Sequence, residues 1–111
     1  LGYAHLDFGK WLSLLLLDSG HANPVEGAQT AWLQKSLEEV KGADYLFAFY
    51  HVGAYPSVRS FIGKRAQTVR KCWTPLFDRF DLTAAFEHPD HALKRSVPIL
   101  GNNKREGGIL Y

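Results

Sequence analysis

The chain has 111 residues, a formal net charge of +2 and an apolar fraction of 46%, which suits one folded domain or part of one and argues against disorder. It has no dense block of lysine and arginine, so nucleic acid is not an expected partner, and its apolar runs, such as residues 14–17, are too short to span a membrane. The single cysteine, Cys72, excludes an intramolecular disulfide and leaves the redox compartment open.

A hairpin is predicted at the start of the chain. Residues 3–8 alternate between apolar and polar side chains, as in a strand with one buried face. Gly9-Lys10 suits the turn, and residues 11–18 form the second strand. The leucines at 14–17 favour burial of this strand on both faces, and His5 is expected on the solvent side of the hairpin.

Two helices are predicted after the hairpin. Residues 28–41 carry apolar side chains at helical spacing, and Gly42 is placed to end that helix. A second helical region covers about residues 65–80. Pro75 lies inside it and should kink or restart the helix, with Thr74 as its cap.

Apolar strands alternate with these helices. They are expected at residues 45–50 and 82–86, with a closing pair at 97–100 and 109–111. This order of elements favours a layered α/β sheet.

Histidines follow two of the predicted strands. His51 comes directly after residues 45–50, while His88 and His91 follow residues 82–86. Imidazole is the commonest metal ligand in proteins, and layered α/β folds bind ligands at the carboxyl ends of their strands. The pattern therefore predicts a metal site at one edge of the sheet.

The order of motifs resembles the second half of a calcineurin-like metallophosphoesterase domain, and most closely the purple acid phosphatase branch. The resemblance covers nearly the whole chain. It rests on Leu-Leu-Asp-Ser at 16–19, Gly-Ala-Gln-Thr-Ala-Trp-Leu at 27–33, the run at 50–57 and the histidine motif at 88–96.

This resemblance implies part of a four-layer αββα sandwich and the hydrolysis of phosphate esters at a centre of two metal ions, with Fe, Zn and Mn as candidates. It implies that His51 and His91 are metal ligands. Pro89 stands where the family's terminal motif has its other histidine, so His88 would serve as a ligand only if the loop backbone shifts.

The resemblance also implies that ligands are missing. The family's first three motifs, Asp-x-His, Gly-Asp-x-x-Asp and Gly-Asn-His, are absent from residues 1–111, which are expected to be the C-terminal portion of the domain and inactive by themselves. Pairing with a missing N-terminal portion is therefore expected, or formation of a homodimer through an uncovered apolar face. The compartment is not indicated, although relatives in this branch are often exported.

Four further residues are candidates for the site. Arg59 is expected to contact the substrate phosphate, with Lys64 and Arg65 in the same stretch as alternatives. His21 follows a strand and either approaches the substrate or is an exposed loop histidine. Tyr55 either lines the substrate entrance or serves aromatic packing, and Asp90 either orients His91 from behind or stabilises a turn. No proton donor or other catalytic side chain is predicted.

Two other functions stay open. The chain is alternatively a degenerate, non-catalytic interaction module that kept the fold and lost the metals, a reading that Pro89 favours. A mononuclear site made by His51, His88 and His91 is the third possibility.

Overall fold

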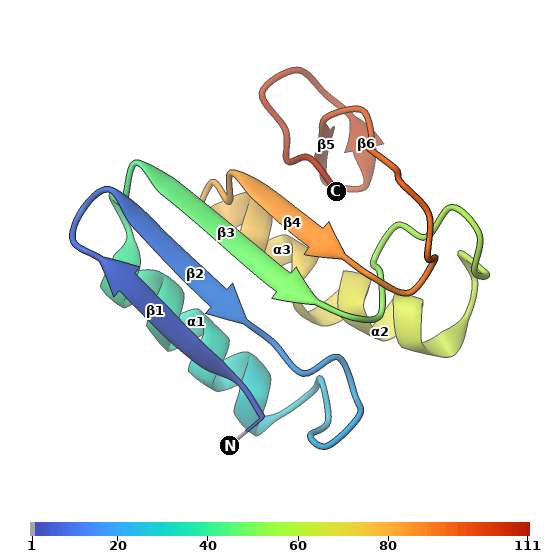
Figure 1. Ribbon diagram of the computed structural model, residues 1–111, viewed down its shortest axis with the longest axis horizontal. Coiled ribbons are helices and arrows are strands. Elements are labelled where there is room, and N and C mark those ends of the chain that lie inside the picture. The colour runs from blue at the N-terminus through green and yellow to red at the C-terminus, as the bar shows by residue number, and fades with distance from the viewer. Residues whose placement is uncertain (1) are drawn as a thin grey trace.

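The computed structural model describes residues 2–111, which form an α/β fold on a four-stranded mixed sheet (Figure 1). The strands lie in the order β1 (Ala4–Phe8), β2 (Leu12–Leu16), β3 (Tyr45–Tyr50) and β4 (Ala84–Glu87). β1 and β2 form an antiparallel hairpin, whereas β2, β3 and β4 run parallel. The predicted α/β class and the hairpin are confirmed.

All three helices lie on one face of this sheet, behind it in Figure 1. They are α1 (Ala28–Val40), α2 (Lys64–Cys72) and α3 (Thr74–Arg79). The hydrophobic core lies between the helices and the sheet, because the side chains that meet there are buried; they include Leu15, Ala48, Leu33, Leu37, Val69, Trp73 and Phe77. The described residues thus form two layers, one of helices and one of strands.

The predicted helix at 65–80 is interrupted. Residue Trp73 separates α2 from α3, and Pro75 lies in the first turn of α3, where its missing N–H costs no hydrogen bond. The predicted restart at Pro75 is confirmed. The prediction that Thr74 caps it is wrong, because the Thr74 hydroxyl instead donates to the carbonyl of Arg70 in the preceding turn.

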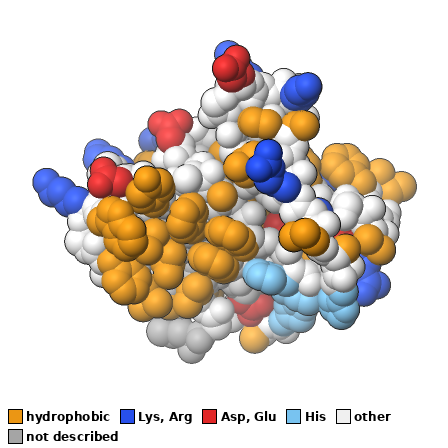
Figure 2. Space-filling view, turned by 45° about the horizontal axis from the view of Figure 1, so that its top comes forward, with side chains coloured by type: hydrophobic (Ala, Val, Ile, Leu, Met, Phe, Trp, Pro, Cys, Tyr) orange, Lys and Arg blue, Asp and Glu red, His pale blue; other side chains and the backbone are white. Residues whose placement is uncertain are grey.

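The other face of the sheet is apolar and uncovered. Leu16 on β2 is 38% exposed and Phe86 on β4 is 42% exposed. Every outward position of the four strands is apolar or tyrosine: Ala4, Leu6, Phe8, Leu12, Leu14, Leu16, Tyr45, Phe47, Phe49, Ala84 and Phe86. Figure 2 shows this surface as a broad hydrophobic patch. We call these residues the open face.

The open face overturns two expectations about the hairpin. The leucines of β2 are not buried on both faces, because only Leu15 points toward the helices while Leu14 and Leu16 lie on the open face. β1 has the reverse of the expected orientation. Its apolar residues face outward, and His5 lies toward α1 with its ring centroid 6.0 Å from that of Trp32.

The end of the chain closes against β4. A small hairpin joins β5 (Ile99–Leu100) to β6 (Asn103–Lys104), and Ile99 pairs with Ile109 as the predicted closing strands require. Leu110 then pairs in parallel with Ala84 at the edge of the main sheet. Within residues 2–111, no helix has the length and apolarity needed to cross a bilayer.

Candidate functional site

The carboxyl ends of β3 and β4 meet at one edge of the sheet. Tyr50 pairs in register with Glu87, and the backbone N–H of His88 donates to the carbonyl of His51 over 3.2 Å. The residues that follow these two strands are therefore neighbours, as the sequence predicted. Figure 2 shows histidine side chains gathered beside the hydrophobic patch.

The loop after β2 brings a further imidazole to this edge. The ring centroids of His21 and His51 lie 5.1 Å apart in an edge-on arrangement. Buried Ser19 fixes the loop, because its hydroxyl accepts a 2.7 Å hydrogen bond from the Val52 N–H next to His51. His21 thus belongs to the imidazole cluster, which we define as His21, His51, His88 and His91.

Asp18 and Gln29 hold the His21 loop in shape. The Asp18 carboxylate accepts hydrogen bonds from the backbone N–H groups of His21, Ala22 and Asn23. Burial raises the pKa of Asp18, but these hydrogen bonds outweigh it and lower the pKa to about 2. Gln29 of α1 is buried and bonds to both the N–H and the carbonyl of Asp18. The Gly-x-Gln-x-x-Trp motif therefore anchors α1 to this loop.

The electrostatics of the cluster favour a neutral His51. His51 is exposed, but neighbouring atoms displace part of the water around its ring. This loss of hydration disfavours the protonated form and lowers the pKa of His51 below the ordinary value of 6.5. Repulsion from neighbouring basic side chains, which counts only to the extent that each is protonated, lowers the pKa of His51 further, in the order His21, His88, His91 and Arg59. Near neutral pH the His51 imidazole thus keeps the free lone pair that a metal ligand needs.

His88 and His91 are placed differently. The Nδ1 atom of His88 lies 3.0 Å from the carbonyl oxygen of Tyr50. A carbonyl only accepts, so Nδ1 carries the proton and Nε2 keeps its lone pair, as in metal-binding histidines oriented by a backbone carbonyl. His91 has a φ of +49°, a left-handed conformation that is uncommon outside glycine, and its side chain is exposed.

Asp90 fixes the loop that carries Arg59. The residue is buried, with 8% of its surface exposed, and its carboxylate accepts hydrogen bonds from the N–H groups of Ser57, Val58 and Arg59 and from the Ser57 hydroxyl. These are the contacts of a loop-stabilising aspartate, and no bond joins the carboxylate to His91. Burial raises the pKa of Asp90, but the donated hydrogen bonds hold it far below its ordinary value.

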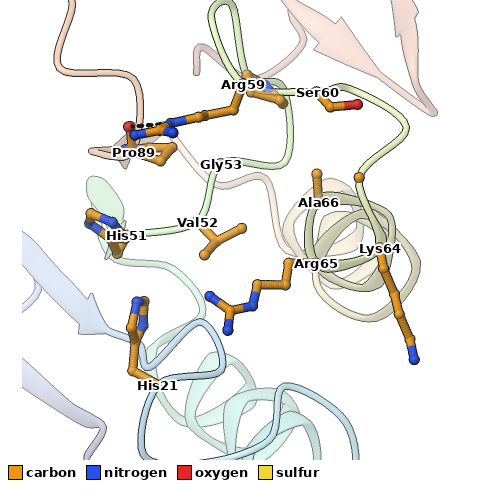
Figure 3. A pocket seen from close by; sticks show the side chains of 12 residues that line it. His21, His51, Val52, Gly53, Arg59, Ser60, Lys64, Arg65, Ala66 and Pro89 are labelled. Atoms are coloured by element: carbon orange, nitrogen blue, oxygen red, sulfur yellow. Dashed lines mark hydrogen bonds between the residues drawn. The ribbon is translucent and has the colours of Figure 1, made fainter.

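Arg59 and Tyr55 have different surroundings. The Arg59 Nε donates to the carbonyl of Pro89 over 3.2 Å, so its guanidinium lies beside the imidazole edge (Figure 3). Tyr55 is directed elsewhere. Its hydroxyl donates to Asn102 Oδ1 over 2.6 Å, and its ring packs on Tyr111 with centroids 4.5 Å apart. Tyr55 is absent from the lining of the cavity beside the cluster.

Sequence reasoning missed a buried ion pair below the cluster. Glu87 has a fully buried side chain and accepts hydrogen bonds from the Tyr50 hydroxyl, the Ala54 N–H and the Lys94 ammonium group. Lys94 also donates to the carbonyl of Tyr55. The alternation of β4 offered a signal, because Glu87 shares the inward side with buried Ala85. The pair fixes the backbone between the two histidine segments.

The cluster fits a metal by its chemistry but not by its number of ligands. Imidazoles suit Zn, Fe and Mn together with oxygen ligands. Across residues 2–111, no three His, Cys, Asp or Glu side chains lie close enough together to hold a metal ion. Further ligands from outside this part of the chain would be needed.

Comparisons with known proteins identify no family. No protein-family model matches the sequence, and no curated protein matches it. The metallophosphoesterase assignment therefore stays a prediction from the motifs.

Proposed function

We propose that this chain is the C-terminal portion of a phosphate-ester hydrolase of the calcineurin-like type, with two metal ions at the imidazole cluster. The observation that carries the proposal is the meeting of His51 and His88 at the carboxyl ends of two neighbouring parallel strands. His91 follows on the same loop. Polar side chains at such an edge are the usual basis of a ligand site in layered α/β folds.

The residues of the cluster would have separate tasks. His51 and His91 would hold metal, and His88 would stand in for the ligand that Pro89 cannot provide. The hydrogen bond from His88 to the Tyr50 carbonyl supports this role, because it fixes the ring and leaves Nε2 available. Arg59, held beside Pro89, would bind a phosphoryl oxygen.

The metal ions would supply the chemistry that these side chains lack. When bound, two cations polarise a phosphoryl group and ease the attack of water on phosphorus. The chain's own residues would bind and orient: His51, His88 and His91 would hold the cations, and Arg59 and His21 would face the substrate.

The open face supports the four-layer αββα architecture. A strand with alternating side chains normally turns its apolar side toward a core, yet β1 turns Leu6 and Phe8 away from the helices. Apolar patches of this extent usually mark an interface. A second sheet packed on the open face would bury it, and the strand ends of that sheet would reach the imidazole edge with the missing ligands.

Turnover of an aryl phosphate by the native protein tests the proposal. We expect hydrolysis that needs added Zn, Fe or Mn and that falls by about a hundredfold or more in His51→Ala. His5→Gln is the matched control, since His5 lies on β1, packs beside Trp32 of α1 and is not part of the cluster. Activity that is equal in His51→Ala and the control would refute the proposal.

The non-catalytic module remains a second candidate. The incomplete ligand set within residues 2–111 and Pro89 favour it. In that case the open face would bind a partner protein, and the native protein would hold no metal between pH 5 and pH 8. Metal content therefore separates the two candidates.

A further inference from the structure

A cavity of about 410 Å³ lies directly beside the imidazole cluster. Four segments form it: the loop after β2, the loop after β3, the first turn of α2 and, through Pro89, the loop after β4 (Figure 3). His21 and His51 lie along one side, and α2 lies on the other. This volume is within the range of small-molecule sites. The cavity is therefore larger than a single phosphate group.

The cavity is lined by cationic groups without acidic counterparts. Arg59, Lys64 and Arg65 contribute to its wall, and none of its lining residues is Asp or Glu. Figure 3 shows the Arg65 guanidinium reaching from α2 toward Val52 and His21, whereas the Lys64 side chain points away. Neither Arg59 nor Arg65 forms an ion pair with a carboxylate of residues 2–111.

Such an arrangement suits an anionic ligand. Guanidinium groups bind phosphate and carboxylate through paired N–H donors, and they repel one another when no anion lies between them. Val52, Pro56 and Ala66 add apolar wall, which strengthens charge interactions by excluding water. The first turn of α2 has no side-chain cap, so its free N–H groups add to the positive potential.

Arg59 and Arg65 enter the cavity from different places. The Arg59 guanidinium lies at the edge that carries the imidazoles, next to Pro89, whereas Arg65 comes from α2 on the opposite wall. An ester whose reacting phosphoryl group lies at the cluster would extend its other end toward Arg65.

We infer that this cavity selects phosphate esters with a second anionic group, and that Arg65 binds that second group. The inference rests on the proposed function for the position of the reacting phosphoryl group. The second group is a phosphate or a carboxylate, since a guanidinium recognises both.

Calorimetric titration tests the inference without turnover. The probes are inorganic phosphate, pyrophosphate and malonate, each added to the native protein with and without EDTA so that binding at metal ions is separated. With EDTA, pyrophosphate should bind about tenfold more tightly than phosphate, and Arg65→Gln should remove that advantage, as expected for the loss of one charged hydrogen-bonding group.

Arg105→Gln is the matched control, because Arg105 is exposed near β6 and outside the cavity lining. Arg65-dependent binding of malonate would assign the second group as a carboxylate, and binding of pyrophosphate alone would assign it as a phosphate. Equal affinities for phosphate and pyrophosphate, or an Arg65→Gln variant that binds like wild type, would overturn the inference. Because turnover is not measured, loss of the proposed hydrolase activity would leave this result unchanged.

Discussion

Replacing Asp90 by asparagine should destabilise the loop that presents Arg59. The carboxylate accepts three bonds through Oδ2, from the N–H and hydroxyl of Ser57 and the N–H of Val58, and one through Oδ1, from the N–H of Arg59. If the asparagine oxygen takes the place of Oδ2, its NH₂ group faces the Arg59 N–H. One hydrogen bond is then lost, and the remaining three have a neutral acceptor in place of a charged one. Hydrogen bonds to charged groups contribute roughly 1.5–3 kcal/mol, against roughly 0.5–1.5 kcal/mol for neutral ones.

The free energy of unfolding should therefore fall by about 2–3 kcal/mol at pH 7, which for a domain of this size lowers Tm by roughly 8–12 °C. Urea unfolding followed by tryptophan fluorescence measures it. Glu106→Gln is the control, because Glu106 is exposed in the turn after β6, and such surface changes stay within about 0.5 kcal/mol.

The effect of Asp90→Asn should depend on pH in a defined direction. The pKa of Asp90 is lower in the folded protein than its ordinary value of 3.8. Its stabilising contribution is therefore fully present above pH 3.8 and is lost as the pH falls through the folded pKa. The difference in the free energy of unfolding between wild type and Asp90→Asn should become smaller below about pH 4. Equal stability at pH 7, or a difference that is the same at pH 7 and pH 3, would refute this account of the loop.

Three further changes test other parts of the structure. Gln29→Leu removes the partners of both Asp18 backbone groups and should lower the free energy of unfolding by about 2–3 kcal/mol in urea titrations, whereas an unchanged midpoint would contradict the anchoring role. Lys94→Met leaves the buried Glu87 carboxylate without its cation and should cost about 3–5 kcal/mol; the double variant Lys94→Met/Glu87→Gln should recover part of this loss, and no recovery would argue against pairing. Phe86→Ser places a polar group on the open face and should reduce self-association of the isolated chain in sedimentation experiments, while undiminished association would show that another surface is responsible.

The sequence predicted the elements well because the local signals agree with the fold. Alternating side chains in residues 3–8 and the helical spacing in α1 each match the observed element. The position of His51 and His88 at neighbouring strand ends followed from the general arrangement of parallel strands. Local periodicity shows that a strand has two different faces. The parallel order of the strands shows that their carboxyl ends meet at one edge of the sheet.

Periodicity does not show which face is covered. The apolar side of β1 was expected to point into the core, and the structure turns it outward with Phe47 and Phe49 of β3. That choice depends on what lies across the sheet, which is a property of the tertiary structure. The uncovered aromatic face arises from the pairing of strands distant in the chain. Glu87 and Lys94 are only seven positions apart, but the burial of this pair depends on distant partners such as Tyr50 and Ala54, so neither feature was visible in local patterns.

Loop conformation limited the prediction of the site in a similar way. Tyr55 lies near the cluster in sequence, but its hydroxyl bonds to Asn102 and its ring packs on Tyr111, 56 positions further along the chain. The sequence offered Arg59, Lys64 and Arg65 as alternative phosphate contacts, and the direction of Arg65 into the cavity depends on where α2 begins. Such directions follow from the folded loops and not from the spacing of residues.

The metal content of the native protein, measured by mass spectrometry after purification without chelators, tests the central claim most directly. We expect two ions of Zn, Fe or Mn for each assembled site, and the loss of at least one ion in His51→Ala and in His91→Ala. A native protein without bound metal, or variants that retain the full wild-type content, would contradict the assignment of these imidazoles as ligands.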